Sequence, residues 1–241
     1  TDGSDFGQAS PAMPESPDRP QSPGRTQSPE LQSIVVLPFD NLSPNPDNAF
    51  FADGLTEEVI ADLSRVKALR VISRTSAMAF KGTTKTVPTI AQELNVRYAL
   101  EGSVRREGGN LRITAQLIDG ASDVHLWAEK YSGSVGDVFD LQERLSRRIV
   151  DALSITLSDA EDRRLADRPL QDVRVYDIWL RAREHALTLS PQGLEHAREL
   201  VEQAIAMADP NALLHATLAW IHAVRFAQIL HGADEALDLA R

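Results

Sequence analysis

Apolar residues follow two kinds of pattern in the first part of the chain. A continuous apolar run at residues 34–37 predicts a short strand buried on both faces, and a second short strand is predicted at residues 69–72. Between them, apolar residues recur at helical spacing over residues 55–66, which predicts a helix that opens at residues 53–58 with Asp53 or Thr56 as its cap. A loop that contains Lys81 and Gly82 is expected after the second strand, and then a shorter helix at residues 88–94, where a proline suits the first turn.

The next segments alternate apolar and polar residues, as half-buried strands do. Residues 96–104 and 111–117 show this alternation, and Gly108-Gly109-Asn110 between them is a hairpin signal. A third strand, which carries Trp127, is predicted at residues 124–131. We therefore predict an antiparallel meander with one face in water. Helical spacing returns over residues 138–157 and predicts a long amphipathic helix.

Only helical spacing remains after Pro169. Helices are predicted at residues 173–189 and 192–207, followed by at least one more. The predicted fold class is therefore α+β: a mixed α/β domain with the order strand, helix, strand, helix, three strands, helix, and then an all-α region.

The change of pattern sets the predicted domain limits. The α/β domain is expected over residues 33–160, a linker over residues 161–171 and the helical region over residues 172–241. Residues 1–32 are rich in proline and serine and poor in apolar residues, so they are predicted to form a disordered linker.

Composition excludes several classes of function. The net charge of −10 disfavours direct contact of these residues with nucleic acid, because an acidic surface repels phosphate. The absence of cysteine removes disulfides, thiolate catalysis and cysteine metal sites. No apolar run is long enough for a membrane span, and no signal peptide is recognisable. We expect a cytoplasmic location, with the extracytoplasmic part of a membrane-anchored regulator as the alternative.

Ordered matches along the predicted α/β domain carry a resemblance to a known family. The matching segments are IVVLPF (34–39), NLS (41–43), FADGLTE (51–57), VISRTS (71–76), KG (81–82), ELNVRYALEGSVR (93–105), LRITAQLID (111–119), HLWAEKY (125–131) and FDLQ (139–142). With these segments the domain resembles the TolB amino-terminal-like domain of bacterial multidomain regulators.

The resemblance implies a non-catalytic domain that is commonly followed by tetratricopeptide repeats. Its upstream neighbour in such chains is a class III nucleotide cyclase, a winged-helix DNA-binding domain or a serine/threonine kinase. The C-terminal helices are similar to these repeats, since Ala197, Val201 and Ala204 occupy small and apolar positions of a second repeat helix and Pro210 follows them. Trp179 stands at the aromatic position of the first repeat helix.

No motif for catalysis, a cofactor or a metal is recognisable. The chain lacks a phosphate-binding loop, a dinucleotide fingerprint, a nucleophile-elbow serine and a paired-histidine zinc motif. The acidic loop at residues 40–48 lacks the spacing of a calcium site. We therefore expect no catalytic residue, no cofactor and no metal.

One group of predicted binding residues follows the second strand. Ligands of open α/β sheets bind at the carboxyl ends of strands, and Arg74, Thr75, Ser76 and Lys81 stand at that position. These four are the predicted ligand-binding residues, and a solvated loop is the alternative.

A second group lies on the first C-terminal helix. Arg174, Arg181 and Arg183 form a basic strip in an acidic chain and are predicted to bind an acidic peptide of a protein partner. Ion pairing with acidic residues of the same helix is the alternative.

Together these observations favour a non-catalytic sensory or protein-interaction region of a bacterial multidomain regulator, which binds a protein or a small ligand. The alternative is the regulatory C-terminal part of an adenylate or guanylate cyclase, or of a kinase, whose catalytic domain lies upstream. The expected partners are a protein or peptide on the helical repeats and the upstream domain of the same chain.

Overall fold

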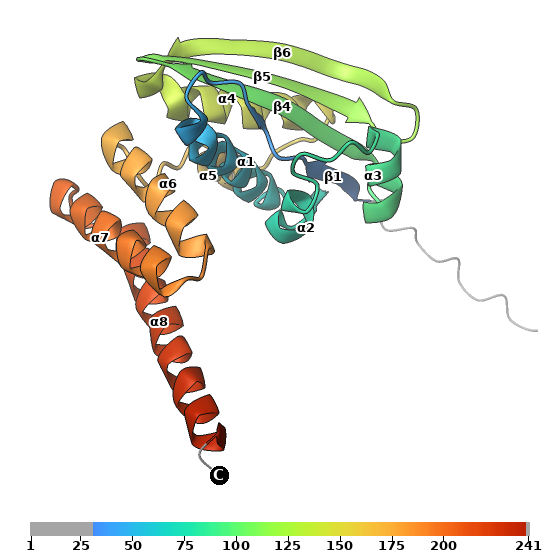
Figure 1. Ribbon diagram of the computed structural model, residues 1–241. Helices are drawn as coiled ribbons and strands as arrows, with labels where there is room; N and C mark the ends of the chain where they lie inside the picture. Colours follow the sequence, from blue (N-terminus) through green and yellow to red (C-terminus); the bar gives the residue numbers. More distant parts are fainter. Residues whose placement is uncertain (1–30, 240–241) are drawn as a thin grey trace, which may run out of the picture. The chain divides into compact units, whose positions relative to one another are not determined.

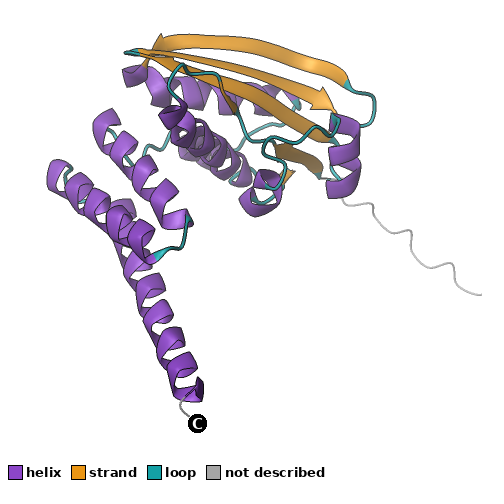
Figure 2. Cartoon of the chain, in the orientation of Figure 1, coloured by secondary structure: helices purple, strands orange, loops and turns teal. Residues whose placement is uncertain are grey.

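The computed structural model describes residues 31–239 of the chain, which form an α/β domain followed by three helices (Figure 1). The predicted linker at residues 1–32 lies outside the described residues except for its last two positions, and Gln32 already belongs to the first strand. The predicted fold class, a mixed α/β domain followed by an all-α region, is confirmed (Figure 2).

A central strand explains the continuous apolar run near the start of the described chain. β1 (Gln32–Val36) lies between β3 (Leu69–Val71) and β4 (Tyr98–Glu107) and is parallel to both. Residues 34–36 are completely buried, so both faces of the sheet are shielded from water at this strand. A central strand of this kind cannot alternate apolar and polar residues.

The predicted antiparallel meander is confirmed. β5 (Asn110–Asp119) pairs with β4 on one side and with β6 (Val124–Ser134) on the other, so the sheet has the order β3-β1-β4-β5-β6. Gly108 and Gly109 form the two-residue turn between β4 and β5, and Gly108 has a φ of 58°, which a side chain would strain. A two-residue strand, β2 (Asp40–Asn41), pairs with β4 in parallel.

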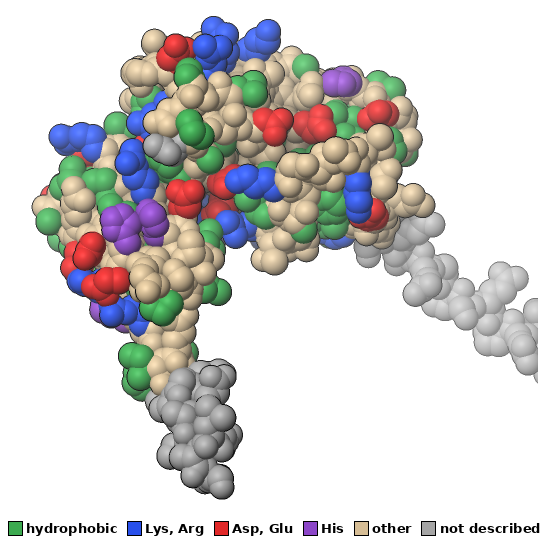
Figure 3. Space-filling model, in the orientation of Figure 1, with side chains coloured by type: hydrophobic (Ala, Val, Ile, Leu, Met, Phe, Trp, Pro, Cys, Tyr) green, Lys and Arg blue, Asp and Glu red, His purple; other side chains and the backbone are tan. Residues whose placement is uncertain are grey.

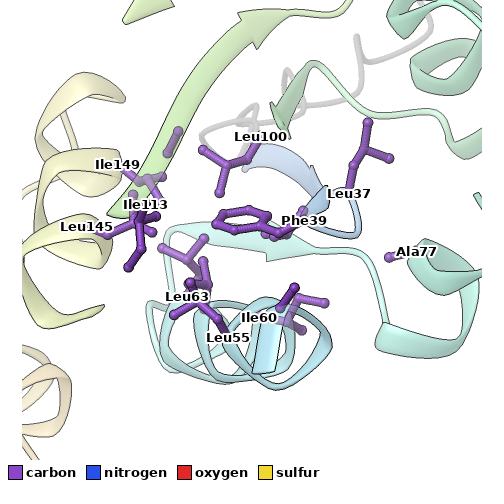
Figure 4. Close-up of a cluster of buried hydrophobic side chains, with 14 of the residues drawn as sticks. Leu37, Phe39, Leu55, Ile60, Leu63, Ala77, Leu100, Ile113, Leu145 and Ile149 are labelled. Carbon is purple, nitrogen blue, oxygen red and sulfur yellow. The ribbon is translucent and has the colours of Figure 1, made fainter. Parts of the chain in front are cut away.

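Two helices build the core on one face of the sheet (Figure 1). They are α1 (Ala49–Ser64) and α4 (Val138–Ala152), and two shorter helices, α2 (Arg74–Met78) and α3 (Val87–Leu94), flank them. Figure 4 shows side chains from the strands and from both long helices meeting in this core. They include Phe39, Leu55, Leu63, Leu100, Ile113, Leu145 and Ile149.

Three helices complete the described chain: α6 (Val173–Leu187), α7 (Pro191–Met207) and α8 (Ala212–Leu239). α6 packs against both α1 and α7, and the large apolar cluster of the α/β domain extends without a break into α6 through Tyr176 and Trp179. The predicted limits of residues 33–160, 161–171 and 172–241 stay a prediction, and so does the tetratricopeptide assignment.

The predicted opening of α1 at residues 53–58 was wrong. The helix begins at Ala49, so Asp53 and Gly54 lie within it rather than at its cap. Thr56 is completely buried, and its hydroxyl accepts a hydrogen bond from Phe39 N and donates one to Ala52 O. The predicted loop after the second strand was also wrong in part, because Ser73 caps the short helix α2 there.

The predicted linker at residues 161–171 contains most of a short helix, α5 (Asp159–Leu165). Ser158 and Glu161 form a capping box, in which each side chain bonds the backbone N–H of the other residue. The preceding helix ends at Ala152 and not at residue 157, because Ser154 adopts a left-handed conformation with a φ of 54°.

Replacing Glu161 by glutamine is expected to lower the melting temperature at pH 7. The Glu161 carboxylate accepts hydrogen bonds from Lys67 N and from Ser158, which lowers its pKa from 4.5 to about 2. The folded protein therefore gains stability above pH 4.5 and loses it as the pH falls toward 2. The difference between the wild type and the variant should shrink over that range, as thermal melts at several pH values would show. A constant difference would exclude the carboxylate as its cause, and Asp159→Asn, next to the cap, is the control.

Candidate functional site

A groove of about 310 Å³ lies where α1, α2 and α6 meet. Its lining residues come from these three helices and from the segments that follow α2 and α6. They are Phe50, Asp53, Gly54, Glu57, Arg74, Met78, Lys81, Leu180, Arg183, Glu184, Leu187 and Thr188. Three acidic and three basic side chains line the groove. Figure 3 likewise shows both signs of charge side by side on the face that it draws, rather than a patch of one sign.

Glu57 of α1 joins the two sides of the groove. One carboxylate oxygen accepts a hydrogen bond from Arg74 Nε, and the other accepts one from Arg183 Nη2. Only 7% of the Glu57 side chain is exposed, while about a third of each arginine side chain is. We call this set of three residues the Glu57 bridge, and it links the α/β domain to α6.

Both arginines of the Glu57 bridge are partly removed from water. Arg183 lies over the Trp179 ring, with its guanidinium carbon 4.6 Å from the ring centroid. Burial lowers the pKa of Arg183 to about 10 and also lowers that of Arg74. A cation that has lost part of its water gains more from an anionic partner than a fully solvated cation does, so these arginines are suited to hold a carboxylate or a phosphate.

Lys81 closes the groove on the α2 side. Its Nζ lies 2.7 Å from Asp53 Oδ1, and about half of its side chain is exposed. On the α6 side, Leu180 approaches α1 so closely that a Cβ at Gly54 would lie 2.5 Å from Leu180 Cδ2. Glycine in the middle of α1 therefore permits the close approach of α6 that shapes the groove.

The seven predicted binding residues do not form a single site. Arg74 and Lys81 of the first group and Arg183 of the second line the groove together. Thr75 and Ser76 are exposed and lie outside it.

The other two predicted arginines pair along their own helix or its cap. Arg174 pairs with Asp172 at 2.6 Å, and Arg181 pairs with Asp177 at 3.1 Å. Arg181 also lies over the Phe50 ring, 4.9 Å from its centroid. Local ion pairing therefore describes these two residues, whereas Arg183 reaches across to α1.

Sequence reasoning missed the acidic partners in the groove. Glu57 is 126 residues from Arg183 along the chain, and no spacing rule connects positions that far apart. Asp53 was interpreted as a helix cap, which hid its pairing with Lys81. A recognisable signal was the run Glu57-Glu58 on a helix whose other residues are mostly buried, since buried carboxylates need partners.

Neither a metal-binding cluster nor a membrane-spanning helix occurs in the part of the chain that the structure describes. Within residues 31–239, no group of three or more His, Cys, Asp or Glu side chains is arranged to hold a metal ion. In the same range, no helix combines the length and apolar character that crossing a membrane requires.

Comparison with known sequences finds similarity to a family model and to a curated protein. Residues 30–151 match the model described as "HilA/YgeH-like transcriptional regulator, second domain". "Putative adenylate cyclase 3" of Rhizobium meliloti (strain 1021) is 41% identical over 214 residues, which make up 87% of this chain and 36% of that protein. The chain thus spans about a third of the length of this relative.

Solved structures overlap with roughly half of the chain. TolB from Acinetobacter baumannii is 20% identical with a TM-score of 0.41, over 52% of this chain and 29% of TolB. Lipoprotein GNA1162 from Neisseria meningitidis is 19% identical with a TM-score of 0.37, over 51% of this chain and 98% of the lipoprotein.

Proposed function

The chain belongs to the family that the second domain of HilA/YgeH-like transcriptional regulators defines, and we propose that it is a non-catalytic regulatory region of a longer protein. The similarity to the putative adenylate cyclase supports this proposal, because it covers most of this chain but only about a third of that protein. In this proposal the regulatory region senses a ligand or a partner, and another part of the longer protein carries the activity that is regulated.

The groove between α1, α2 and α6 supports the sensory role. It gathers Arg74, Lys81 and Arg183 from three segments, and each cation is held by a carboxylate of α1. An acidic ligand entering the groove would replace Glu57 or Asp53 as the partner of these cations. Because the Glu57 bridge links α1 to α6, such an exchange would change how firmly the α/β domain holds the helices.

The C-terminal helices supply the second part of the proposal. We assign α6, α7 and α8 as tetratricopeptide-like helices that contact a protein partner or another domain of the longer protein. The apolar cluster between them is small, and its buried members are Ala182, Ala186, Leu194, Ala197, Val201 and Ile221. Small residues at such a seam let helices approach closely, as stacked helical repeats require.

Two outputs fit this role, and each has its own support. Identity of 41% to a putative adenylate cyclase favours control of nucleotide cyclisation. The family description favours control of transcription, with DNA bound by another domain, since the acidic charge of this chain disfavours direct DNA contact. Cyclic nucleotide formation by the full-length protein would decide for the first output, and sequence-specific DNA binding without cyclase activity would decide for the second.

The absence of catalysis is tested on the purified chain. With magnesium and either ATP or GTP, we expect no cyclic nucleotide and no hydrolysis above the buffer rate. Turnover that disappears on replacing a single carboxylate, such as Asp53, would contradict the non-catalytic assignment.

Ligand binding in the groove is tested with a synthetic hexaglutamate peptide and with inorganic phosphate as the simplest anion. We expect Arg74→Ala and Lys81→Ala each to weaken binding of the better probe by about tenfold, since a hydrogen bond to a charged group contributes about 1.5–3 kcal/mol. Arg174→Ala is the matched control, because that arginine lies outside the groove and pairs with Asp172. Calorimetric titration measures the affinity of each variant for the probe. Equal affinities for the three variants would refute the groove as the ligand site.

A further inference from the structure

A second hollow lies at the same junction but shares no lining residue with the groove. It is a cavity of about 30 Å³ among α1, α4, α6, the start of α8 and the segment that follows α5. This volume holds about two water-sized groups, given that one needs roughly 10–15 Å³ of such space. Its lining residues are Glu58, Asp62, Arg65, Phe139, Gln142, Glu143, Leu165, Asp167, Arg168, Pro169, Leu170, Tyr176, Trp179 and Leu213.

Two buried polar atoms at this cavity have no hydrogen-bond partner. Tyr176 Oη, on a residue that is 3% exposed, and Gln142 Oε1, on a residue that is 8% exposed, both lack one in the described chain. Both residues line the cavity. An unsatisfied buried polar group costs free energy, so these two atoms indicate a group that the cavity receives from outside.

Two carboxylates complete the polar side of the cavity. Glu58 and Asp62 lie one helical turn apart on α1, and Ser146 Oγ donates a hydrogen bond to Asp62 Oδ2 at 3.1 Å. Burial raises the pKa of Glu58 to about 7 and that of Asp62 to about 6. Burial at this cavity therefore disfavours the charge on both carboxylates, and a bound cation would restore it.

Aromatic rings form the apolar side of the cavity. Phe139 meets Tyr176 edge-on with ring centroids 5.0 Å apart, and the Tyr176 and Trp179 centroids lie 6.0 Å apart. Faces of aromatic rings attract cations, most strongly where water is excluded. The carboxylates and the aromatic rings thus both favour a positively charged ligand.

We propose that this cavity binds an ammonium group, either the free ammonium ion or the head of a primary amine as small as methylammonium. Such a group carries only donors, and the cavity offers acceptors for them in Glu58, Asp62, Gln142 Oε1 and Tyr176 Oη, whose oxygen can accept as well as donate. The volume of about 30 Å³ admits one or two non-hydrogen atoms and excludes a quaternary amine. Bound ammonium would contact α1, α4 and α6 at once and so tie the helices to the α/β domain.

Binding should strengthen as the pH rises from 6 to 8. Ionised Glu58 and Asp62 are the binding forms, and their raised pKa values place the loss of their protons in this range. Other charged groups also lie at or near the cavity and contribute to its electrostatic field together with these two carboxylates. They are Arg65 directly after α1, Glu143 on α4, Asp167 and Arg168 after α5, and Arg183, whose Nη1 lies 3.7 Å from Glu58 Oε1.

The proposal is tested by the melting temperature of the chain at pH 8 in chloride salts of equal ionic strength. Ammonium and methylammonium are expected to raise it by several degrees over sodium, while tetramethylammonium leaves it unchanged. A shift with ammonium but not methylammonium assigns the site to the free ion, and a shift with both assigns it to a primary amine. Equal melting temperatures in the sodium, ammonium, methylammonium and tetramethylammonium salts would overturn the proposal. A rise in potassium chloride equal to that in ammonium chloride would also overturn it.

Two variants locate the effect. Tyr176→Phe removes a hydroxyl that has no partner, so the variant in sodium chloride should melt at or above the wild-type temperature, yet the shift with ammonium should fall by more than half. Glu58→Gln should remove the shift and its dependence on pH. Glu93→Gln, at an exposed ion pair with Lys85, is the control and should keep both. A full shift in Tyr176→Phe and Glu58→Gln would place the bound ammonium elsewhere and refute the assignment.

Discussion

Replacing Glu57 by alanine is expected to lower the free energy of unfolding by about 2–4 kcal/mol, since removing one partner of a buried ion pair leaves the other charge uncompensated. Here two guanidinium groups, those of Arg74 and Arg183, lose their common acceptor while they stay partly buried beside each other. The estimate stays below the full cost for a buried pair because both arginines keep some contact with water. Urea denaturation followed by circular dichroism measures the change.

Exposed ion pairs provide the control for the Glu57 variant. Glu93 pairs with Lys85, both side chains are more than 40% exposed, and Glu93→Ala should therefore change stability by less than about 1 kcal/mol. A second replacement in the Glu57→Ala background, Arg183→Leu, should recover part of the loss, because it removes one of the unpaired cations. If Glu57→Ala and Glu93→Ala destabilise equally, the Glu57 bridge does not hold α6 to the α/β domain.

Replacing Gly102 by alanine is expected to cost about 2–3 kcal/mol of stability, because inserting a methyl group into a packed core forces neighbours to move. Gly102 lies on β4, and a Cβ there would lie 2.7 Å from the Thr114 carbonyl oxygen and 2.8 Å from the ring of buried Phe39. The carbonyl belongs to the neighbouring strand β5 and cannot move away without breaking the hydrogen bonds between β4 and β5. Gly109→Ala, with no atom within 4 Å of its Cβ, is the control and should be nearly neutral. A similar loss in both variants, compared by urea denaturation, would contradict the packing explanation.

The regular part of the fold is predictable because each element has a pattern of its own. Alternation predicts β4 and β5, the two glycines between them predict the turn, and the apolar run predicts the central strand β1. Helical spacing gave α4, α6 and α7 to within a few residues. These signals are local, since each depends only on which face of an element is buried.

The start of α1 could not be predicted, for a reason that lies elsewhere in the fold. Gly54 lowers the helix propensity of this segment, and the pair Asp53-Gly54 is typical of the start of a helix. The structure gives the glycine a tertiary role, because Leu180 of α6 occupies the space that a Cβ would need. Nothing near residue 54 in the sequence indicates a neighbour that is more than a hundred positions away.

The short helix α5 was missed although its signal is present. Ser158 followed by Glu161 is the pattern of a capping box, and the acidic residues of its first turn with Arg163 and Arg164 in its last turn suit the helix dipole. The high charge density of this segment favours a linker and outweighs the capping signal when only the sequence is considered.

The groove is predictable only in part. The rule that ligands bind at the carboxyl ends of strands predicts Arg74 and Lys81 as binding residues. The presence of a basic strip in an acidic chain predicts Arg183. Their meeting in one groove depends on the packing of α6 on α1, which no sequence pattern specifies. The cavity with Tyr176 and Gln142 was not predicted for the same reason, since both residues read as ordinary helix positions.

Hydrogen–deuterium exchange with and without hexaglutamate tests the proposed sensory role most directly. If the groove is the ligand site and the Glu57 bridge responds to it, amide exchange should change in the segments around residues 49–58, 74–82 and 180–189 and stay constant in β5 and β6. The Arg74→Ala variant should show no such change at the same peptide concentration, whereas Arg174→Ala should behave as the wild type. Unchanged exchange in these three segments with bound peptide, or changes confined to α7 and α8, would contradict the account.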